Sequence, residues 1–252
     1  MAARDEIVRF CDTTLDADAY PDALPVGLQI PGAAEVRKVA SGVSASLELL
    51  RRATASGAQM LFVHHGLFWR NEPRRIDARL KARLQTVFDG DLSLVAYHLC
   101  LDAHPRIGNN ALICQALELT DLKPFAEHHG HTIGFVGTAS PALTIGELEA
   151  RVGARIAPEP LVFADGPAGI ERVAVVSGAA IGDLDAAADA GADAFVTGEP
   201  AEPAMYRAAE AGIHFLAAGH HATEVFGVRA LGDLVAETFA LEHEFIDIPN
   251  PV

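Results

Sequence analysis

Histidine and carboxylate side chains stand where apolar segments of this chain end. His64 and His65 follow the apolar run MLFV, and His98 follows LSLVAY. His220 follows HFLAAG, and Glu199 follows ADAFVTG. Neutral imidazole and carboxylate are ligands for zinc, iron, manganese and nickel. The residue types at these positions therefore point to a metal site.

Two of the histidines begin the same spacing. His98 and Asp102 form His-x3-Asp, while His220 and Glu224 form His-x3-Glu. In open α/β sheets the carboxyl ends of parallel strands meet at one crevice, where ligands bind. A bridging carboxylate can hold two ions about 3.5–4 Å apart, so adjacent histidines could serve one ion each. A His-His pair alone is better explained by hydrogen bonding at a strand end, but its agreement with the two spaced pairs favours metal ligands.

Strand-like and helix-like segments alternate along much of the chain, which is typical of α/β layers around a largely parallel sheet. Continuous apolar runs such as MLFV are typical of strands covered on both faces. The expected strands, some with their exit loops, are 36–43, 60–63, 92–98, 131–137, 160–163, 171–178, 192–200 and 214–224. The expected helices are 3–16, 46–56, 77–88, 109–118, one opening at Thr144 with a capping box, 183–190 and 225–240.

We predict three parts along the chain. Residues 1–122 form a first α/β half, and residues 171–252 form a second. Residues 123–170 differ from both because they are rich in Gly, Pro, His and Thr, and we interpret them as an inserted lobe or linking region.

The two halves resemble each other. Residues 38–40 match 172–174 at a shift of 134, and His98 matches His220 at a shift of 122. A repeat of this length favours duplication of a βα unit. The alternative is that unrelated βα units share similar glycine turns.

The composition excludes several classes of partner. Lysine and arginine number 19 against 34 aspartate and glutamate, which gives a formal net charge of −15. Such a chain is a poor binder of nucleic acids or anionic membranes. Only Arg70, Arg106 and Arg229 lie close to the motifs in sequence, so local charge gives a triphosphate substrate little support. A small-molecule substrate fits better than a nucleic acid or a membrane.

The cysteines and the N-terminal segment favour a cytoplasmic protein. The three cysteines are scattered without a CxxC motif, which fits reduced thiols better than a disulfide framework. The first residues, MAARDEIVRF, carry early acids and lack the apolar region of a signal peptide. No apolar stretch approaches the ~20 residues of a membrane span.

Other candidate motifs are less specific. His128, His129 and His131 form a dense cluster that fits a solvated loop at least as well as a metal site. Residues 108–110 are typical of a turn and a helix N-cap. Neither GxGxxG nor GxxxxGK[ST] occurs, so the two common nucleotide loops are absent from the sequence.

The same motifs carry a family resemblance. The stretches concerned are VHHGLFW (63–69), HLCLDAHPRIGNN (98–110), GADAFVTGE (191–199), AAGHHATEVFGVRAL (217–231) and FIDIPNPV (245–252). In these stretches the chain resembles the Nif-three-like family, whose bacterial members are labelled GTP cyclohydrolase I type 2 homologues. The match runs in order over nearly the whole chain and is weakest across 123–170. One departure is PVGLQIPG (25–32), where the family pattern has Asn before the Gly.

The resemblance implies two divalent metal ions per chain, with zinc, iron or manganese as candidates. Its ligand pattern falls on His64, His65, Asp102, His220 and Glu224, with Glu224 bridging the ions. It also implies two intertwined, duplicated α/β halves with mostly parallel mixed sheets, a small inserted lobe, and a ring-shaped homohexamer.

The leading functional hypothesis is a metal-dependent hydrolase in which metal-activated water attacks an electrophilic carbon or phosphorus. The family label implies opening of the purine ring of GTP or a related substrate with release of formate. We predict that His98 and Glu199 act in catalysis, through proton transfer or by orienting the ligands. The alternatives are a non-catalytic metal-binding scaffold or ring-forming interaction protein, and a metal-dependent phosphoesterase that releases inorganic phosphate.

Overall fold

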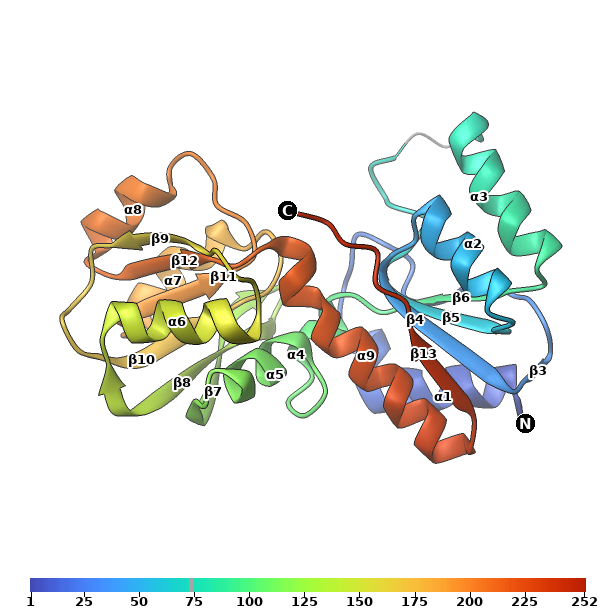
Figure 1. Ribbon diagram of the computed structural model, residues 1–252, viewed down its shortest axis with the longest axis horizontal. Helices are drawn as coiled ribbons and strands as arrows, with labels where there is room; N and C mark the ends of the chain where they lie inside the picture. The colour runs from blue at the N-terminus through green and yellow to red at the C-terminus, as the bar shows by residue number, and fades with distance from the viewer. Residues whose placement is uncertain (73–74) are drawn as a thin grey trace. The chain divides into compact units, whose positions relative to one another are not determined.

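The computed structural model describes residues 1–72 and 75–252 and groups them into two units, each built from two stretches of chain (Figure 1). The first unit comprises Met1–Leu101 and Gly227–Pro249. The second comprises Asp102–Phe226 and Asn250–Val252. These units divide the chain elsewhere than at residues 122 and 170, because the strands of 123–170 complete the sheet of the second unit.

The first unit contains a five-stranded sheet in the order β13-β4-β5-β6-β2. Strands β4, β5 and β6 run parallel, β13 joins β4 in parallel, and β2 closes the other edge antiparallel to β6. The bounds are β2 Gly27–Ile30, β4 Lys38–Ser44, β5 Met60–His65, β6 Ser93–Ala96 and β13 Glu242–Phe245. A short ribbon pairs β1 Ala2–Ala3 with β3 Glu35–Val36.

Helices α2 and α3 supply one layer of the first unit's core. Helix α2 (Leu47–Ala55) begins where the Ser46 side chain accepts a hydrogen bond from the Leu49 N–H. Helix α3 (Ala78–Asp89) begins in the same way after Asp77. Their buried side chains pack on alternate residues of the sheet, among them Leu61 and Val63 of β5.

Helix α1 (Arg4–Leu15) also belongs to the first unit. It is followed by the 3-10 turn η1 (Ala17–Ala19), and its Asp12 accepts a hydrogen bond of 2.6 Å from the Tyr97 hydroxyl, just beyond β6. Phe10 of α1 also meets Phe239 edge to face. These contacts hold α1 against the strand exit that carries His98.

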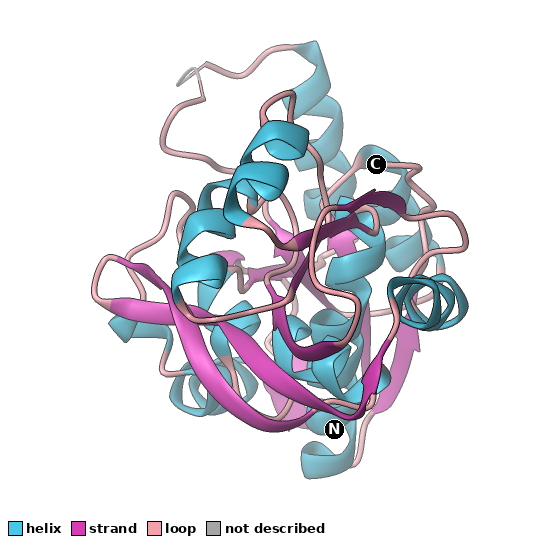
Figure 2. Ribbon diagram, turned by 90° about the vertical axis from the view of Figure 1, so that its left-hand side faces the viewer, coloured by secondary structure: helices cyan, strands magenta, loops and turns pink. Residues whose placement is uncertain are grey.

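The second unit contains a six-stranded sheet in the order β7-β8-β10-β11-β12-β9 (Figure 2). Strands β10, β11 and β12 run parallel, while β8 and β9 are antiparallel to their neighbours β10 and β12. The bounds are β7 Thr120–His128, β8 His131–Leu143, β9 Leu161–Ala164, β10 Ile170–Val175, β11 Ala194–Thr197 and β12 His214–Ala217. The residues predicted as an inserted lobe therefore extend this sheet at both edges.

Helices also pack in layers on the sheet of the second unit. Their bounds are α5 Asn109–Ala116, α6 Ile145–Arg155, α7 Leu184–Asp189, preceded by the 3-10 turn η2 (Ile181–Asp183), and α8 Ala204–Ala211. Helices α5 and α6 pack in one core with Val196 of β11, whereas the neighbouring residue Phe195 contacts Phe215 outside that core. The predicted capping box is confirmed, since Thr144 and Glu147 bond each other's backbone N–H groups.

The central parallel strands of the two sheets share a register, as duplication requires. Val39 of β4 pairs with Met60 of β5, and Val173 of β10 pairs with Ala194 of β11. Both pairings are related by the predicted shift of 134, so this part of the repeat is confirmed. The mixed α/β class is confirmed as well, although the sheet is mostly parallel only in the first unit and has more antiparallel than parallel pairings in the second.

The predicted shift of 122 for the third strand is wrong by one residue within the strand. Ala96 of β6 lies opposite Val63, whereas Ala217 of β12 lies opposite Thr197. The strands therefore match at a shift of 121. One additional residue restores the alignment of the histidines, and it is Gly219, whose φ of +88° suits glycine.

Two helices carry the chain from one unit into the other. Helix α4 (Leu99–Ala103) contains the boundary after Leu101, and helix α9 (His220–Phe239) contains the boundary after Phe226. The sequence prediction assigned 214–224 to a strand with its exit loop and began the last helix at 225, which is wrong because α9 starts five residues earlier. None of the helices in the described part of the chain combines the length and apolarity needed to cross a membrane.

Candidate metal centre

Three histidines gather in the first unit, and we call them the histidine cluster: His64, His65 and His98. Their ring centroids are 4.8 Å apart for His64 and His98, 4.9 Å for His64 and His65, and 5.6 Å for His65 and His98. One nitrogen from each ring lies within 4.8 Å of the others. This spacing fits three ligands around one or more metal ions, so the donor set matches a divalent metal.

The backbone near the end of β5 orients the first two histidines. His64 is fully buried, and its Nδ1 donates to the Tyr97 carbonyl at 3.0 Å. Because a carbonyl only accepts, the proton resides on Nδ1, and in the neutral ring Nε2 keeps the lone pair that a metal needs. His65 is the last residue of β5, and its Nδ1 lies 2.9 Å from the Ser44 hydroxyl.

His98 is oriented by a carboxylate that sequence analysis missed. Its Nδ1 lies 3.0 Å from Oδ1 of Asp22, and the Leu99 N–H donates to the other oxygen of Asp22 at 3.1 Å. Burial favours the neutral carboxyl, but the bonds from His98, Leu99 and Leu24 outweigh it and hold the pKa of Asp22 below its ordinary value. A carboxylate behind a metal-competent histidine fixes its tautomer and leaves Nε2 for the ion. Asp22 lies in the turn YPDALP, which carries no recognisable ligand spacing.

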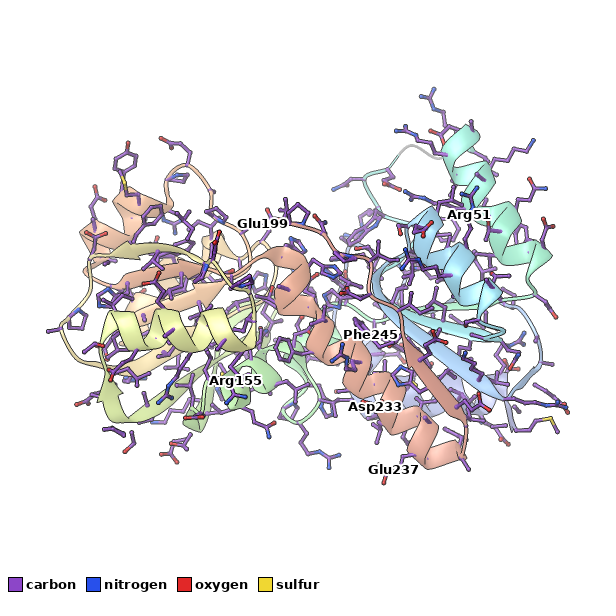
Figure 3. All side chains as sticks on the ribbon, viewed as in Figure 1. Arg51, Arg155, Glu199, Asp233, Glu237 and Phe245 are labelled. Carbon is purple, nitrogen blue, oxygen red and sulfur yellow. The ribbon has the colours of Figure 1, made fainter. Side chains whose placement is uncertain are left out.

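The second unit holds the other predicted residues, and we call them the acidic set: Asp102, Glu199, His220 and Glu224. His220 and Glu224 occupy successive turns at the start of α9, and His220 Nε2 lies 3.0 Å from Glu224 Oε1. His220 Nδ1 lies 2.5 Å from Oε1 of Glu199, which stands in the loop after β11 (Figure 3). The His-x3-Glu spacing is therefore one turn of helix.

The two carboxylates determine the charge of His220. Burial favours its neutral form, but the hydrogen bonds and charges of Glu224 and Glu199 outweigh that effect and raise the pKa of His220 from 6.5 to about 9. The ring is therefore protonated at neutral pH in the metal-free protein. A cation that took the place of the Nε2 proton would face the Glu224 carboxylate, while the Nδ1 proton would stay with Glu199, so the arrangement suits a divalent ion.

Asp102 is buried and held by two neutral donors. Its Oδ1 accepts from Asn109 Nδ2 at 2.8 Å and from the Ser177 hydroxyl at 2.9 Å. The side chain of Asn110, which follows Asn109 in the sequence, accepts a hydrogen bond from the Ser177 N–H at 2.7 Å. The predicted N-cap within 108–110 is confirmed, since Gly108 is the N-cap of α5, and the side chains of Asn109 and Asn110 are buried. Asn109 therefore holds Asp102 directly, and Asn110 holds it through Ser177.

Gly178 connects the parts of the acidic set through its backbone. Its φ is +66°, and a Cβ atom on it would lie 2.6 Å from Glu224 Oε1. Its N–H donates to the Thr223 hydroxyl, and its carbonyl accepts from the N–H groups of Gly198 and Glu199. Only glycine fits this position without moving the carboxylate. At the shift of 134 the corresponding residue of the first unit is Ser44, whose hydroxyl lies 2.9 Å from His65 Nδ1.

The remaining histidines lie in other contacts. His128 at the end of β7 pairs with Asp183 at 3.0 Å, and the ligand groupings found among the described residues include neither it nor His129 or His131. His104 accepts from the N–H groups of Arg106 and Ile107, so it orders the loop after α4. Neither feature adds to the candidate metal centre.

The fold and these donors define a class, namely duplicated α/β proteins with histidines and carboxylates clustered at strand exits. Comparison with known families makes the assignment specific. A family model described as Duf34/NIF3 (NGG1p interacting factor 3) matches residues 2–251. The chain belongs to the DUF34/NIF3 family, which confirms the resemblance seen in the sequence.

Named relatives and solved structures support this membership. A protein of Deinococcus radiodurans named GTP cyclohydrolase 1 type 2 homolog is 42% identical over 247 residues, or 98% of this chain and 94% of that protein. The solved structure of the protein ybgI, of unknown function, is 38% identical and superposes with a TM-score of 0.94 over the full length of both chains. A solved structure from Thermus thermophilus is 37% identical, with a TM-score of 0.91 over the full length of both chains.

Proposed function

We propose that this chain is a metal-dependent hydrolase with two divalent ions per chain. His64, His65, Asp102, His220 and Glu224 would hold the ions, with Glu224 as the bridge. The observation that carries the proposal is that the histidine donors are already oriented. Nδ1 of His64 is fixed by a backbone carbonyl, and Nδ1 of His98 is fixed by a carboxylate. His220 lies between two carboxylates. Five protein ligands for two ions leave positions for water and substrate, which favours catalysis over a closed structural site.

A divalent ion in such a site supplies Lewis acidity and activates water near neutral pH. The chain's own residues would bind the substrate, orient the ligands and transfer protons. Glu199 holds Nδ1 of His220, so it would fix that ring or accept its proton. His98, held at Nδ1 by Asp22, presents Nε2 within the histidine cluster and would transfer a proton to or from the substrate.

The names of the relatives suggest the substrate. They are called GTP cyclohydrolase 1 type 2 homologs, so the proposed reaction is hydrolytic opening of the purine ring of GTP or of a related nucleotide. We further propose zinc, iron or manganese as the metal, a ring-shaped homohexamer as the assembly and the cytoplasm as the location.

Metal content tests the dinuclear site directly. Untagged protein purified without chelator and reloaded with zinc, iron or manganese should contain about two equivalents per chain by inductively coupled plasma mass spectrometry. Glu224→Ala should lose metal. Glu237→Ala, on the exposed side of the same helix (Figure 3), is the matched control and should retain it. Absence of metal after reloading would overturn the proposal.

Product analysis tests the reaction. With GTP as substrate, release of formate supports the cyclohydrolase reaction, whereas inorganic phosphate would instead identify a phosphoesterase. His98→Ala should keep its metal and lose turnover, and loss of metal would make His98 a ligand. Full metal content without turnover of any nucleotide would favour a non-catalytic scaffold.

A further inference from the structure

A cavity of about 450 Å³ opens beside the histidine cluster within the first unit. Its walls include Trp69 and Phe68 as well as Asp22, the carboxylate that holds His98. The Trp69 ring centroid is 5.5 Å from that of His98 and 5.8 Å from that of His65. A planar group stacked on Trp69 would therefore lie next to the candidate metal ligands.

A second cavity of about 260 Å³ adjoins the first, since Leu67, Glu72 and Leu80 line both. Three arginines face this second space, namely Arg75, Arg79 and Arg83. Arg79 and Arg83 are one turn apart on α3, so their side chains lie on the same face of the helix. Together the two cavities have the volume of a site for a small organic ligand.

The charge of this segment is opposite to that of the chain. Residues 67–83 contain six basic and two acidic residues, whereas the whole chain has a net charge of −15. Of the two acids, Asp77 already accepts the Leu80 N–H and pairs with Arg79 at 3.0 Å. By position in the sequence only Arg70 lies close to the His-His motif. Arg79 and Arg83 lie further along the chain, and helix α3 brings them to the wall of the second cavity.

We propose that the two adjoining cavities are the binding site for a nucleotide, with its base on Trp69 and its phosphates on Arg75, Arg79 and Arg83. Aromatic side chains stack on bases of any sequence, and guanidinium groups bind phosphate oxygens through paired N–H donors. This placement would hold a base carbon beside the histidine cluster. In that respect the inference rests on the proposed function and names the residues that would recognise its substrate.

The chain contains a single tryptophan, so fluorescence reports this site directly. Full-length protein, as purified and after chelator treatment, is titrated with GTP, GMP, guanosine and ribose 5-phosphate. GTP and GMP should quench Trp69, with affinities at least tenfold higher than that of guanosine, and ribose 5-phosphate should leave the fluorescence unchanged. Arg83→Ala and, independently, Arg75→Ala should weaken GTP binding about tenfold. Lys81→Ala is the matched control, because Lys81 is exposed on the same helix and lines neither cavity.

The outcomes separate this inference from the proposed hydrolase. Quenching that depends on Arg83 in protein that takes up no metal supports the nucleotide site and refutes the metal-dependent function. Two bound metals without quenching by any nucleotide leaves the metal site standing and overturns the nucleotide site. Equal affinity for guanosine and GMP, or equal losses from Arg83→Ala and Lys81→Ala, overturns it as well.

Discussion

Replacing Gly178 by alanine should disrupt the acidic set by a route that can be measured. The substitution has two effects, since it places a side chain at a φ of +66° and puts a Cβ 2.6 Å from Glu224 Oε1. Gly212 offers a matched control at the C-terminus of α8, because its φ is +67° and a Cβ there meets nothing within 4 Å. Gly212→Ala therefore carries the backbone strain alone.

The expected losses of stability follow from these two effects. A left-handed conformation costs a non-glycine residue roughly 1–2 kcal/mol, which corresponds to a Tm lower by roughly 2–8 °C for a chain of this size. In Gly178→Ala the buried Glu224 carboxylate must also move, and its 3.0 Å contact with His220 is lost. A hydrogen bond to a charged group contributes about 1.5–3 kcal/mol, so Gly178→Ala should lower the Tm about twice as much as Gly212→Ala.

Metal affinity provides the more specific readout. We expect Gly178→Ala to weaken zinc binding at least tenfold, or about 1.4 kcal/mol, in competition with a chromophoric chelator, and Gly212→Ala to leave it unchanged. Thermal melts with and without zinc should show a smaller stabilisation by metal for Gly178→Ala. Equal Tm losses together with equal zinc affinities for the two variants would refute the reasoning.

Three further predictions concern the same residues. Asp22→Asn should lower activity about 10–100-fold at unchanged metal content by releasing His98, whereas Asp233→Asn, which breaks an Asp–His pair with His243, should leave activity unchanged; equal activities of the two variants would contradict this. The pKa of His220 is raised to about 9, so its charged ring stabilises the metal-free protein fully below pH 6.5, and this contribution is lost as the pH rises through 9. Metal binding near pH 7 should accordingly release about one proton from this ring, and calorimetric heats that do not depend on the ionisation enthalpy of the buffer would count against it. Cobalt(II) bound at the histidine cluster should quench the fluorescence of Trp69, which lies beside the cluster. Quenching that survives replacement of all three clustered histidines would show that cobalt does not bind there.

The sequence predicted the central parallel strands because their patterns are strong. Strand β5 is a continuous apolar run, and its predicted bounds match apart from the two histidines that extend it. The same holds for α6, whose start at Thr144 is signalled by a capping box. Edge strands were harder to predict because they are half exposed. Strand β7 contains Pro124 and few buried residues, and β13 reads Glu-His-Glu-Phe, so neither has a clear apolar pattern.

The candidate site was only partly predictable for a related reason. Histidines and acids at strand exits follow a rule of α/β sheets, so His64, His98 and Glu224 could be identified from spacing. Asp22 and Ser177 could not, because they reach their partners His98 and Asp102 from positions 76 and 75 residues away in the chain. Only the tertiary structure brings such pairs together.

The first unit is built from two stretches far apart in the chain, and this has a consequence for synthesis of the protein. Strand β4 ends at Ser44, but its neighbour β13 begins only at Glu242, and Ile246 then enters the core that α2 helps to form. At ribosomal rates of about 5–20 residues per second, roughly 10–40 s separate the emergence of these two strands. All strands of the second unit lie between Thr120 and Ala217, so the unit encoded later can complete its sheet earlier. During that interval the open edge of β4 is the part of the nascent chain most exposed to wrong pairing.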